Sequence, residues 1–237
     1  MRWGDFYGRH RLMEPAPTWT TFSALEALSG FAHRFTLRHP RIQVDVERDA
    51  AIRRLWDWHC QQAEELGFSR QSLCIAQQVH GAEVAVLSEP PRSIISGVDG
   101  IISNASDLVI GIYVADCCAV YLADGRTGAF GVVHSGKKGS ELGITAKAIE
   151  LMRRHYGTDP TDVHVQLSPC IRPPAYEIDF AAQIRKQARD AGVPAAQVHD
   201  DGVCTSSDLR RFYSYRMEKG HTGRMMALLG RPSRLQR

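Results

Sequence analysis

Two cysteines and a histidine lie on either side of a predicted turn, at a spacing that could bring a thiolate and an imidazole together. Two β-rich runs within residues 114–139 flank Asp124-Gly125-Arg126-Thr127-Gly128, which is typical of a turn between antiparallel strands. With the turn centred near its third residue, His134 lies across the ladder from Cys117 or Cys118. Facing side chains then have Cβ atoms about 4.5–5.5 Å apart, so the two groups could share one metal ion or one proton. Side chains alternate along a strand, so only one cysteine points the same way as His134, and periodicity does not choose between them.

A basic turn follows His134. Ser135-Gly136-Lys137-Lys138-Gly139 comes after a predicted strand and shortly before a predicted helix. Backbone N–H groups and ammonium charges in such a loop could bind phosphate. The spacing is not that of a Walker motif, and the same residues are common in solvated turns. Lys137 and Lys138 are therefore candidate phosphate ligands, with a solvated turn as the alternative.

A second histidine, His80, lies in the segment Gln77-Gln78-Val79-His80-Gly81 between two predicted strands. Gly81 allows the backbone to turn sharply there. The local sequence does not show whether His80 meets the hairpin. A loop histidine bonded to a backbone carbonyl is the simpler interpretation.

The elements that must position these side chains follow from apolar periodicity and turn residues. Helices are predicted over about 49–66, where Asp49 is the expected N-cap, and over 143–155, from Asp179 to near Gly192, and from Ser207 to Lys219. Strands are predicted over 73–76, 83–87, 100–103, 108–114, 119–123, 129–133, 163–167 and 224–229. This order is neither strict alternation nor all-β. It predicts a mixed α/β (α+β) sandwich, with a largely antiparallel mixed sheet covered by helices, and one domain over 1–237 whose first 20 or so residues are peripheral.

Composition excludes several classes of protein. The hydrophobic fraction of 43% and charged fraction of 23% are those of a globular chain. A net charge of +3 over 237 residues is too small to favour nucleic acid or an anionic membrane as a partner. The sequence shows no apolar run long enough for a signal peptide or a membrane span, which predicts a cytoplasmic protein. The six cysteines are spread along a large chain, so free thiols are expected, and no zinc-finger spacing is present.

At these motifs the chain resembles the laccase-domain family, whose members are variously named multicopper polyphenol oxidase, peptidoglycan editing factor and purine nucleoside phosphorylase. No single motif is specific, but their order and spacing over roughly residues 77–229 are. The matching segments are Gln78-Val79-His80-Gly81, Asp99-Gly100, Ala115-Asp116-Cys117, 134–139, 168–171, 176–178, Cys204-Thr205, 213–216 and Thr222-Gly223-Arg224.

The resemblance implies that His80, Cys117 and His134 form a metal-binding and catalytic triplet, usually described as holding zinc, and it thereby selects Cys117 over Cys118. Two imidazoles and one thiolate leave the fourth tetrahedral position of zinc open, as in catalytic sites. The resemblance also implies phosphorolysis of adenosine or inosine to the base and ribose 1-phosphate, acceptance of methylthioadenosine, and adenosine deamination. Purine nucleoside and phosphate are then the partners of a monomer or homodimer. Arg216 joins the two lysines as a candidate phosphate ligand.

The chain departs from the family pattern at one informative place. Lys137-Lys138 replaces a Trp-Arg pair, so a planar bidentate anion ligand becomes a flexible point charge and an aromatic wall is lost. Residues before Gln77 show only a faint likeness. The chain is therefore expected to be a divergent member.

Three alternatives remain open. Cys117 and His134 could be the nucleophile and base of a metal-free cysteine hydrolase. A copper-dependent polyphenol oxidase is less favoured, because none of the ten histidines forms a His-x-His pair. The substitution at Lys137-Lys138 could also leave an inactive binding homologue.

Other polar residues receive structural interpretations. Asp116 is expected either to orient a histidine of the site or to form a hydrogen bond at a strand end. Asp179 is expected to be a helix cap, and His59 a packed and hydrogen-bonded core histidine. Cys60, Cys74, Cys118 and Cys170 are expected to be buried.

Overall fold

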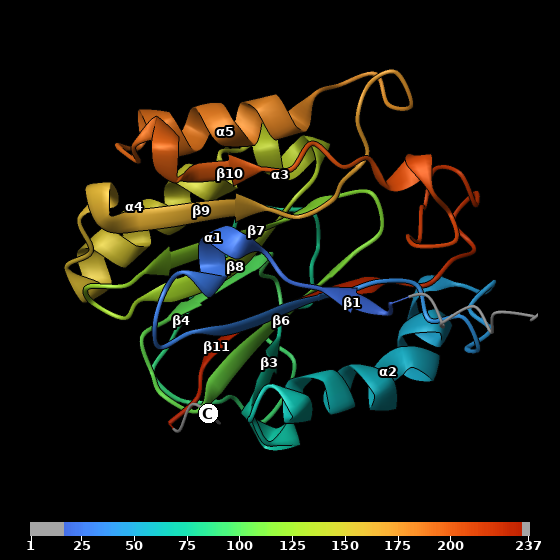
Figure 1. Ribbon diagram of the computed structural model, residues 1–237, viewed down its shortest axis with the longest axis horizontal. Coiled ribbons are helices and arrows are strands. Elements are labelled where there is room, and N and C mark those ends of the chain that lie inside the picture. Colours follow the sequence, from blue (N-terminus) through green and yellow to red (C-terminus); the bar gives the residue numbers. More distant parts are fainter. Residues whose placement is uncertain (1–16, 234–237) are drawn as a thin grey trace, which may run out of the picture.

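Two β-sheets lie face to face between helices in the computed structural model of the chain, which describes residues 17–233. In Figure 1, α3 (Lys137–Glu141), α4 (Ile144–Tyr156) and α5 (Phe180–Asp190) lie over one sheet. The long helix α2 (Arg48–Glu65) lies beyond the other sheet. The predicted mixed α/β class is confirmed, with the strands divided between two sheets.

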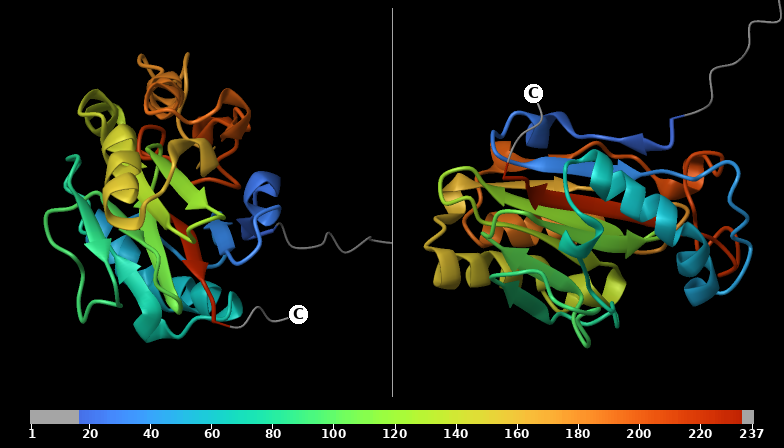
Figure 2. Two further views of the ribbon diagram at one scale, coloured as in Figure 1. Left: turned by 90° about the vertical axis from the view of Figure 1, so that its left-hand side faces the viewer. Right: turned by 90° about the horizontal axis from the view of Figure 1, so that it is seen from below.

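The five-stranded sheet has the order β1-β2-β11-β6-β3, and the six-stranded sheet has the order β10-β9-β7-β8-β5-β4. Most strand pairs are antiparallel. Figure 2 shows the last strand, β11, in red between β2 and β6. The five-stranded sheet contains β1 (Trp19–Thr20), β2 (Ala32–Thr36), β3 (Leu73–Ile75), β6 (Leu108–Val114) and β11 (Met225–Arg231). The six-stranded sheet contains β4 (Val84–Leu87), β5 (Gly100–Ser103), β7 (Cys118–Asp124), β8 (Phe130–Ser135), β9 (Val163–Leu167) and β10 (Val198–Asp200).

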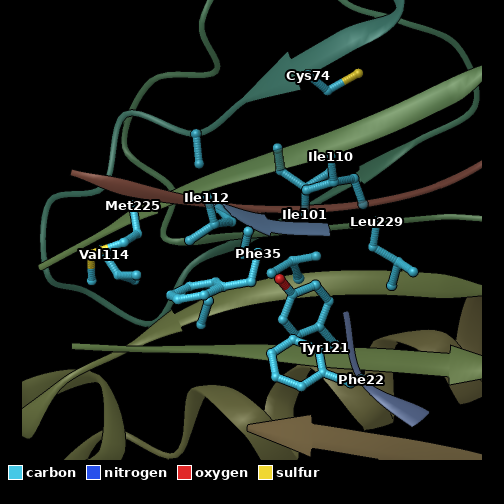
Figure 3. Close-up of a cluster of buried hydrophobic side chains, with 14 of the residues drawn as sticks. Phe22, Phe35, Cys74, Ile101, Ile110, Ile112, Val114, Tyr121, Met225 and Leu229 are labelled. Atoms are coloured by element: carbon cyan, nitrogen blue, oxygen red, sulfur yellow. The ribbon is translucent and has the colours of Figure 1, made fainter. Parts of the chain in front are cut away.

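The central strands are buried on both faces, which explains their continuous apolar sequences. Along β6, Ile110 and Ile112 face the cluster between the two sheets, whereas Val109 and Tyr113 join a separate cluster with Cys60 of α2. Figure 3 shows the inter-sheet cluster, in which Tyr121 of β7 lies near residues of the opposite sheet. Burial of each large apolar side chain contributes about 1.5–3 kcal/mol, so apolar packing holds the layers together.

Three predicted helices are present and one is absent. Helix α2 begins at Arg48, and Glu47 precedes it without a side-chain cap, so the prediction that Asp49 is the N-cap was wrong. Asp179 does cap α5, because its carboxylate accepts the N–H of Ala182 at 2.8 Å. The helix predicted from Ser207 to Lys219 is wrong. The chain there forms a short 3-10 turn, Thr205–Ser207, and then turns.

Tertiary hydrogen bonds explain the missing helix. The Glu218 carboxylate accepts the Ser214 N–H at 3.0 Å and a hydrogen bond from Arg38 at 2.6 Å. The Asp116 carboxylate accepts the Ser214 hydroxyl at 3.0 Å and the Arg216 N–H at 2.7 Å. These contacts hold the segment against the sheet in an irregular conformation, which overrides its helical periodicity.

Buried groups match most expectations. All six cysteines are free thiols, and Cys60, Cys74, Cys118 and Cys170 are buried. His59 is completely buried beside Tyr113, with ring centroids 5.5 Å apart. The expectation that His59 is hydrogen-bonded was wrong, because neither of its ring nitrogens has a partner within residues 17–233. In the same part of the chain, no helix has both the length and the apolar character needed to cross a membrane.

Candidate active site

The hairpin of β7 and β8 places His134 one residue away from its predicted register. His134 pairs with Ala119, and Cys118 pairs with Ser135, so neither predicted cysteine lies directly across the ladder. Cys117 lies two positions before Ala119 and therefore shares its face with His134. Cys118 points to the opposite face, into the cluster under the helices. The alternation of side chains thus separates the two cysteines.

The His80 loop is attached to this hairpin through Asp99, which immediately precedes β5. The Asp99 carboxylate accepts three backbone N–H groups, from Val79 at 3.1 Å, His80 at 2.9 Å and Gly81 at 2.7 Å. One of its oxygens also lies 2.9 Å from Nδ1 of His134. The backbone of His80 has a φ of 59°, an uncommon conformation for a residue with a side chain. Asp99 therefore fixes the loop and the histidine ring at the same time.

His80, Cys117 and His134 converge. Their ligand atoms all lie within 4.8 Å of one another. The two imidazole rings are 4.9 Å apart at an interplanar angle of 78°. His134 is buried, Cys117 is half-buried and His80 is exposed, so the group opens to solvent on the side of His80. Two imidazole nitrogens and one thiolate are a donor set that fits zinc or copper.

Gly136 gives Cys117 its space. A Cβ atom added at Gly136 would lie 2.4 Å from Sγ of Cys117. Since that separation is shorter than any real contact, a side chain at position 136 would displace the sulfur. The glycine two residues after His134 is thus required by the position of the thiol.

The charges and hydrogen bonds around Cys117 and His134 favour a thiolate and an imidazolium in the metal-free protein. Burial would raise the pKa of Cys117, but the charge of His134 and hydrogen bonds to His134 and His80 lower it to about 6. Burial would lower the pKa of His134, but the Cys117 thiolate and the hydrogen bond to Asp99 raise it to about 9. Between these two values the sulfur is a nucleophile or a metal ligand without further deprotonation.

A cavity of about 810 Å³ opens beside the triplet, a size suited to a small ligand. Its wall combines aromatic and basic side chains from segments far apart in the sequence. The aromatic side chains are Tyr113, Tyr176, Phe180 and Tyr215, and the basic ones are Arg48, Lys137, Arg216, Lys219, His221 and Arg224.

The candidate phosphate ligands are not all in this wall. Lys137 and Arg216 line the cavity, but Lys138 does not. The Arg216 guanidinium lies 3.4 Å from the Glu177 carboxylate and 5.5 Å from the ring centroid of Tyr176. It is thus already engaged by an exposed ion pair.

Of the two roles expected for Asp116, the structure has the hydrogen-bonding role at a strand end, and its carboxylate does not contact a histidine of the site. Its backbone has a φ of 84°, and its carboxylate accepts the hydroxyls of Thr205 and Ser214 and the N–H of Arg216. Asp116 therefore joins the start of β7 to a distant loop. The histidine partner is Asp99, for which the Asp-Gly step just before a predicted strand was the available signal.

Comparison with known proteins identifies the family. The sequence model of the family described as "Multi-copper polyphenol oxidoreductase laccase" matches residues 57–181 and 176–232. "Purine nucleoside phosphorylase YlmD" of Geobacillus stearothermophilus is 26% identical over 207 residues, covering 71% of this chain and 76% of that protein. A purine nucleoside phosphorylase of Mycobacterium tuberculosis is 28% identical over 193 residues, covering 70% and 75%.

Solved structures share the fold. The crystal structure of YlmD from Geobacillus stearothermophilus superposes with a TM-score of 0.80 at 23% identity, covering 93% of this chain and 98% of that one. The hypothetical protein YfiH of Bacillus licheniformis gives a TM-score of 0.76 at 21% identity, covering 84% and 92%. The chain, with its distributed motifs and its His-Cys-His triplet, is a divergent member of the multi-copper polyphenol oxidoreductase laccase family.

Proposed function

We propose that the chain is a metal-dependent purine nucleoside phosphorylase that cleaves adenosine or inosine with phosphate to the free base and ribose 1-phosphate. The observation that carries the proposal is the convergence of His80, Cys117 and His134 beside a cavity of about 810 Å³. The relatives named purine nucleoside phosphorylase support this substrate class. Acceptance of methylthioadenosine and deamination of adenosine are further parts of the proposal and rest on the family resemblance.

Zinc is the proposed metal, with His80, Cys117 and His134 as its ligands. When bound, zinc would supply a Lewis acid beside the substrate, since three protein ligands leave one position open. Copper oxidase chemistry is less supported. Within residues 17–233, this triplet is the only group of three or more neighbouring His, Cys, Asp or Glu ligands, whereas a multicopper centre requires several.

The contacts of each side chain indicate its role. The Asp99 carboxylate holds a proton on Nδ1 of His134, so Nε2 is the ring nitrogen that would bind the metal. Tyr176 and Tyr215 line the cavity and offer aromatic surface to a purine ring. In the reaction, a phosphate oxygen forms a bond to C1′ of ribose as the bond from C1′ to the purine breaks, and the base leaves with that electron pair.

The test is an assay of metal-replete protein with adenosine, with and without phosphate. Adenine and ribose 1-phosphate that form only when phosphate is present are the expected products, and Cys117→Ala removes them. Inosine or hypoxanthine formed without phosphate would report deamination. An absence of all these products from the unaltered chain would contradict the proposal.

A metal-free cysteine hydrolase is the second candidate, favoured by the pKa of about 6 for Cys117 and of about 9 for His134. Metal analysis separates the two. Zinc near one equivalent supports the phosphorylase, whereas a metal-free protein that loses activity on alkylation of Cys117 supports the hydrolase.

An inactive binding homologue is tested by replacing Lys137-Lys138 with Trp-Arg. Activity that arises only in this double variant would show that the unaltered chain is a non-catalytic binder. Turnover by the unaltered chain excludes that alternative.

A further inference from the structure

Arg224 is a buried cation without a carboxylate partner. It is 7% exposed, and no carboxylate among residues 17–233 forms an ion pair or hydrogen bond with it. One guanidinium nitrogen, Nη1, donates to the carbonyl oxygens of Thr222 and Gly223, each at 2.8 Å. Burial of a charge without a counter-ion is unfavourable. Because Arg224 lines the cavity, its remaining N–H groups are available to a ligand there.

A second guanidinium increases this unfavourable charge. Arg48, the first residue of α2, lines the same cavity. Burial lowers the pKa of Arg224, and the neighbouring charge of Arg48 lowers it further. The ion-pair partner of Arg48 is Asp49, whose side chain is 76% exposed, so it screens Arg48 weakly. Two like charges facing one cavity are stabilised when an anion binds between them.

The nearby acidic groups do not pair directly with Arg224. The charges of Cys117 and Asp116 raise its pKa but do not outweigh burial, and Glu47, which also lines the cavity, lies 3.1 Å from His221. The Asp116 carboxylate is used by Thr205, Ser214 and the backbone of Arg216. The guanidinium of Arg224 lies 5.9 Å from the ring centroid of Tyr215, which restricts it from one side without neutralising it. The cavity therefore holds a fixed, forked donor that no carboxylate of residues 17–233 pairs with directly.

We propose that Arg224 and Arg48, in place of Lys137 and Lys138, form the oxyanion-binding site of the cavity. Its ligand is a phosphoryl dianion, which would accept the remaining N–H groups of Arg224 and be attracted by the charge of Arg48, whose terminal nitrogens contact Asp49 and the Gln77 carbonyl. The assignment of that ligand as the co-substrate phosphate rests on the proposed function. The site also explains how the chain could retain phosphate although Lys137-Lys138 replaces the Trp-Arg of the family pattern.

Calorimetric titration of the full chain with inorganic phosphate, without nucleoside, tests the site. Arg224→Gln and Arg48→Gln are each expected to weaken phosphate binding at least about tenfold, as for loss of a hydrogen bond to a charged group. Lys137→Gln is expected to stay within about twofold, because its ammonium is exposed and flexible. Arg53→Gln is the matched control, since Arg53 is exposed on the same helix and lies outside this cavity.

One further variant, Arg224→Lys, and the Arg48→Gln variant keep the test decisive if Arg224→Gln does not fold. Arg224→Lys keeps the charge but loses the fork, so intermediate affinity is expected. Arg48 is 39% exposed in its side chain, so Arg48→Gln is expected to fold and carries the test if Arg224→Gln does not. Unchanged phosphate affinity in Arg48→Gln and in any folded Arg224 variant would overturn the proposal. Loss of affinity in Lys137→Gln instead would also overturn it.

Titrations with phosphate plus adenosine, and with adenosine 5′-monophosphate, identify the source of the anion. Phosphate that binds together with adenosine assigns the site to the co-substrate. A nucleotide that binds through Arg224 and excludes phosphate assigns it to a 5′-phosphate. Phosphate binding that depends on Arg224 in a protein without phosphorolysis would uphold this site and reject the proposed function. Phosphorolysis whose KM for phosphate is unchanged in Arg224→Lys and Arg48→Gln would uphold the proposed function and reject this phosphate site.

Discussion

Asp99 is the residue on which the geometry of the site depends most directly. Its carboxylate binds the backbone of Val79, His80 and Gly81 and also Nδ1 of His134. The sequence provided the residue types of the triplet, and the resemblance selected Cys117. Neither the sequence pattern nor the resemblance identified Asp99 as the partner of His134. The contact joins residues 35 positions apart that meet only in the folded sheet.

Asp99→Asn should weaken the site without removing any ligand. An amide cannot accept all of these N–H groups and carries no charge, so His134 loses its fixed orientation. We expect metal affinity or turnover to fall about 10–100-fold, the usual effect of losing a histidine's carboxylate partner. Competition with a chelator measures the affinity, and the adenosine assay measures turnover. If both stay within about twofold in a folded variant, Asp99 does not have this role.

Cys117 should react at unusually low pH in metal-free protein. Its pKa is lowered to about 6, so the thiolate that attacks iodoacetamide is expected to persist until the pH falls through about 6. An ordinary cysteine has a pKa of about 8.5. The rate of alkylation against pH, after subtraction of the rate for Cys117→Ser, gives the midpoint. His134→Asn should move the midpoint upward, and a midpoint near 8.5 in the unaltered protein would contradict the ion pair.

The same two groups predict how stability depends on pH. The pKa of Cys117 is lowered on folding, so its contribution is lost as the pH falls through about 6. The pKa of His134 is raised on folding, so its contribution is lost as the pH rises through about 9. The Cys117 contribution is complete only above the ordinary thiol pKa of about 8.5, and the His134 contribution only below the ordinary imidazole pKa of about 6.5, so one grows as the other declines. Urea unfolding of the metal-free protein should therefore show little net dependence on pH from this pair between about 6 and 9. Cys117→Ser removes one of the two offsetting contributions, so its pH profile of stability should differ from that of the unaltered protein, and identical profiles would show that the pair does not contribute.

At the scale of the elements, prediction succeeded where burial on both faces produces continuous apolar runs. The bounds of β5, β6 and β9 match the predicted ranges 100–103, 108–114 and 163–167. The predicted helix from Ser207 to Lys219 was wrong, because side chains of Asp116 and Glu218 bind its backbone in another conformation. The short N-terminal elements β1, α1 (Ser23–Glu26) and β2 were not predicted, since two to five residues carry little periodicity.

The hairpin shows why register is harder to predict than the strands themselves. Asp124 and Ala129 close its turn, with the Asp124 N–H donating to the Ala129 carbonyl at 2.8 Å. This shifts the ladder by one residue from a turn centred on Arg126, and a shift of one residue changes which side chains face each other. The turn sequence does not show whether the turn is centred on Arg126 or between Arg126 and Thr127, and this difference decides the register.

Gly136→Ala is expected to lower the activity of the site more than the stability of the hairpin. The added Cβ would lie 2.4 Å from Sγ of Cys117, so the sulfur must move. A displacement of about 1 Å at a reacting group can cost about 100-fold in rate, and we expect a loss of at least about tenfold. Gly125→Ala in the turn is the control, because its Cβ would meet only Leu28 at 3.9 Å. Comparable activity of the two variants would show that the sulfur is not confined by Gly136.

At the scale of the whole molecule, the site is assembled from both sheets. Tyr113 and Val114 at the end of β6 line the cavity from one sheet, and His134 of β8 lines it from the other. Arg48 comes from α2 and Arg224 from the segment before β11. The sequence allowed the His-Cys part of the site to be predicted, since it is local to one hairpin. The Arg224–Arg48 pair could not be predicted, because these residues are far apart in the sequence and meet only where the start of α2 lies near the segment before β11.

This assembly predicts that metal binding stabilises the whole fold. His80, Cys117 and His134 come from separate segments, so unfolding disperses the ligands and metal should bind the folded state preferentially. At a free zinc concentration about 100 times Kd, the expected gain is about 2.7 kcal/mol. For a chain of this size, each kcal/mol raises Tm by about 2–4 °C. Thermal unfolding of the full chain with zinc and with chelator measures the difference, and Cys117→Ala should abolish most of it. An equal zinc effect in Cys117→Ala would place the metal elsewhere, and no effect in the unaltered protein would reject metal binding at the triplet.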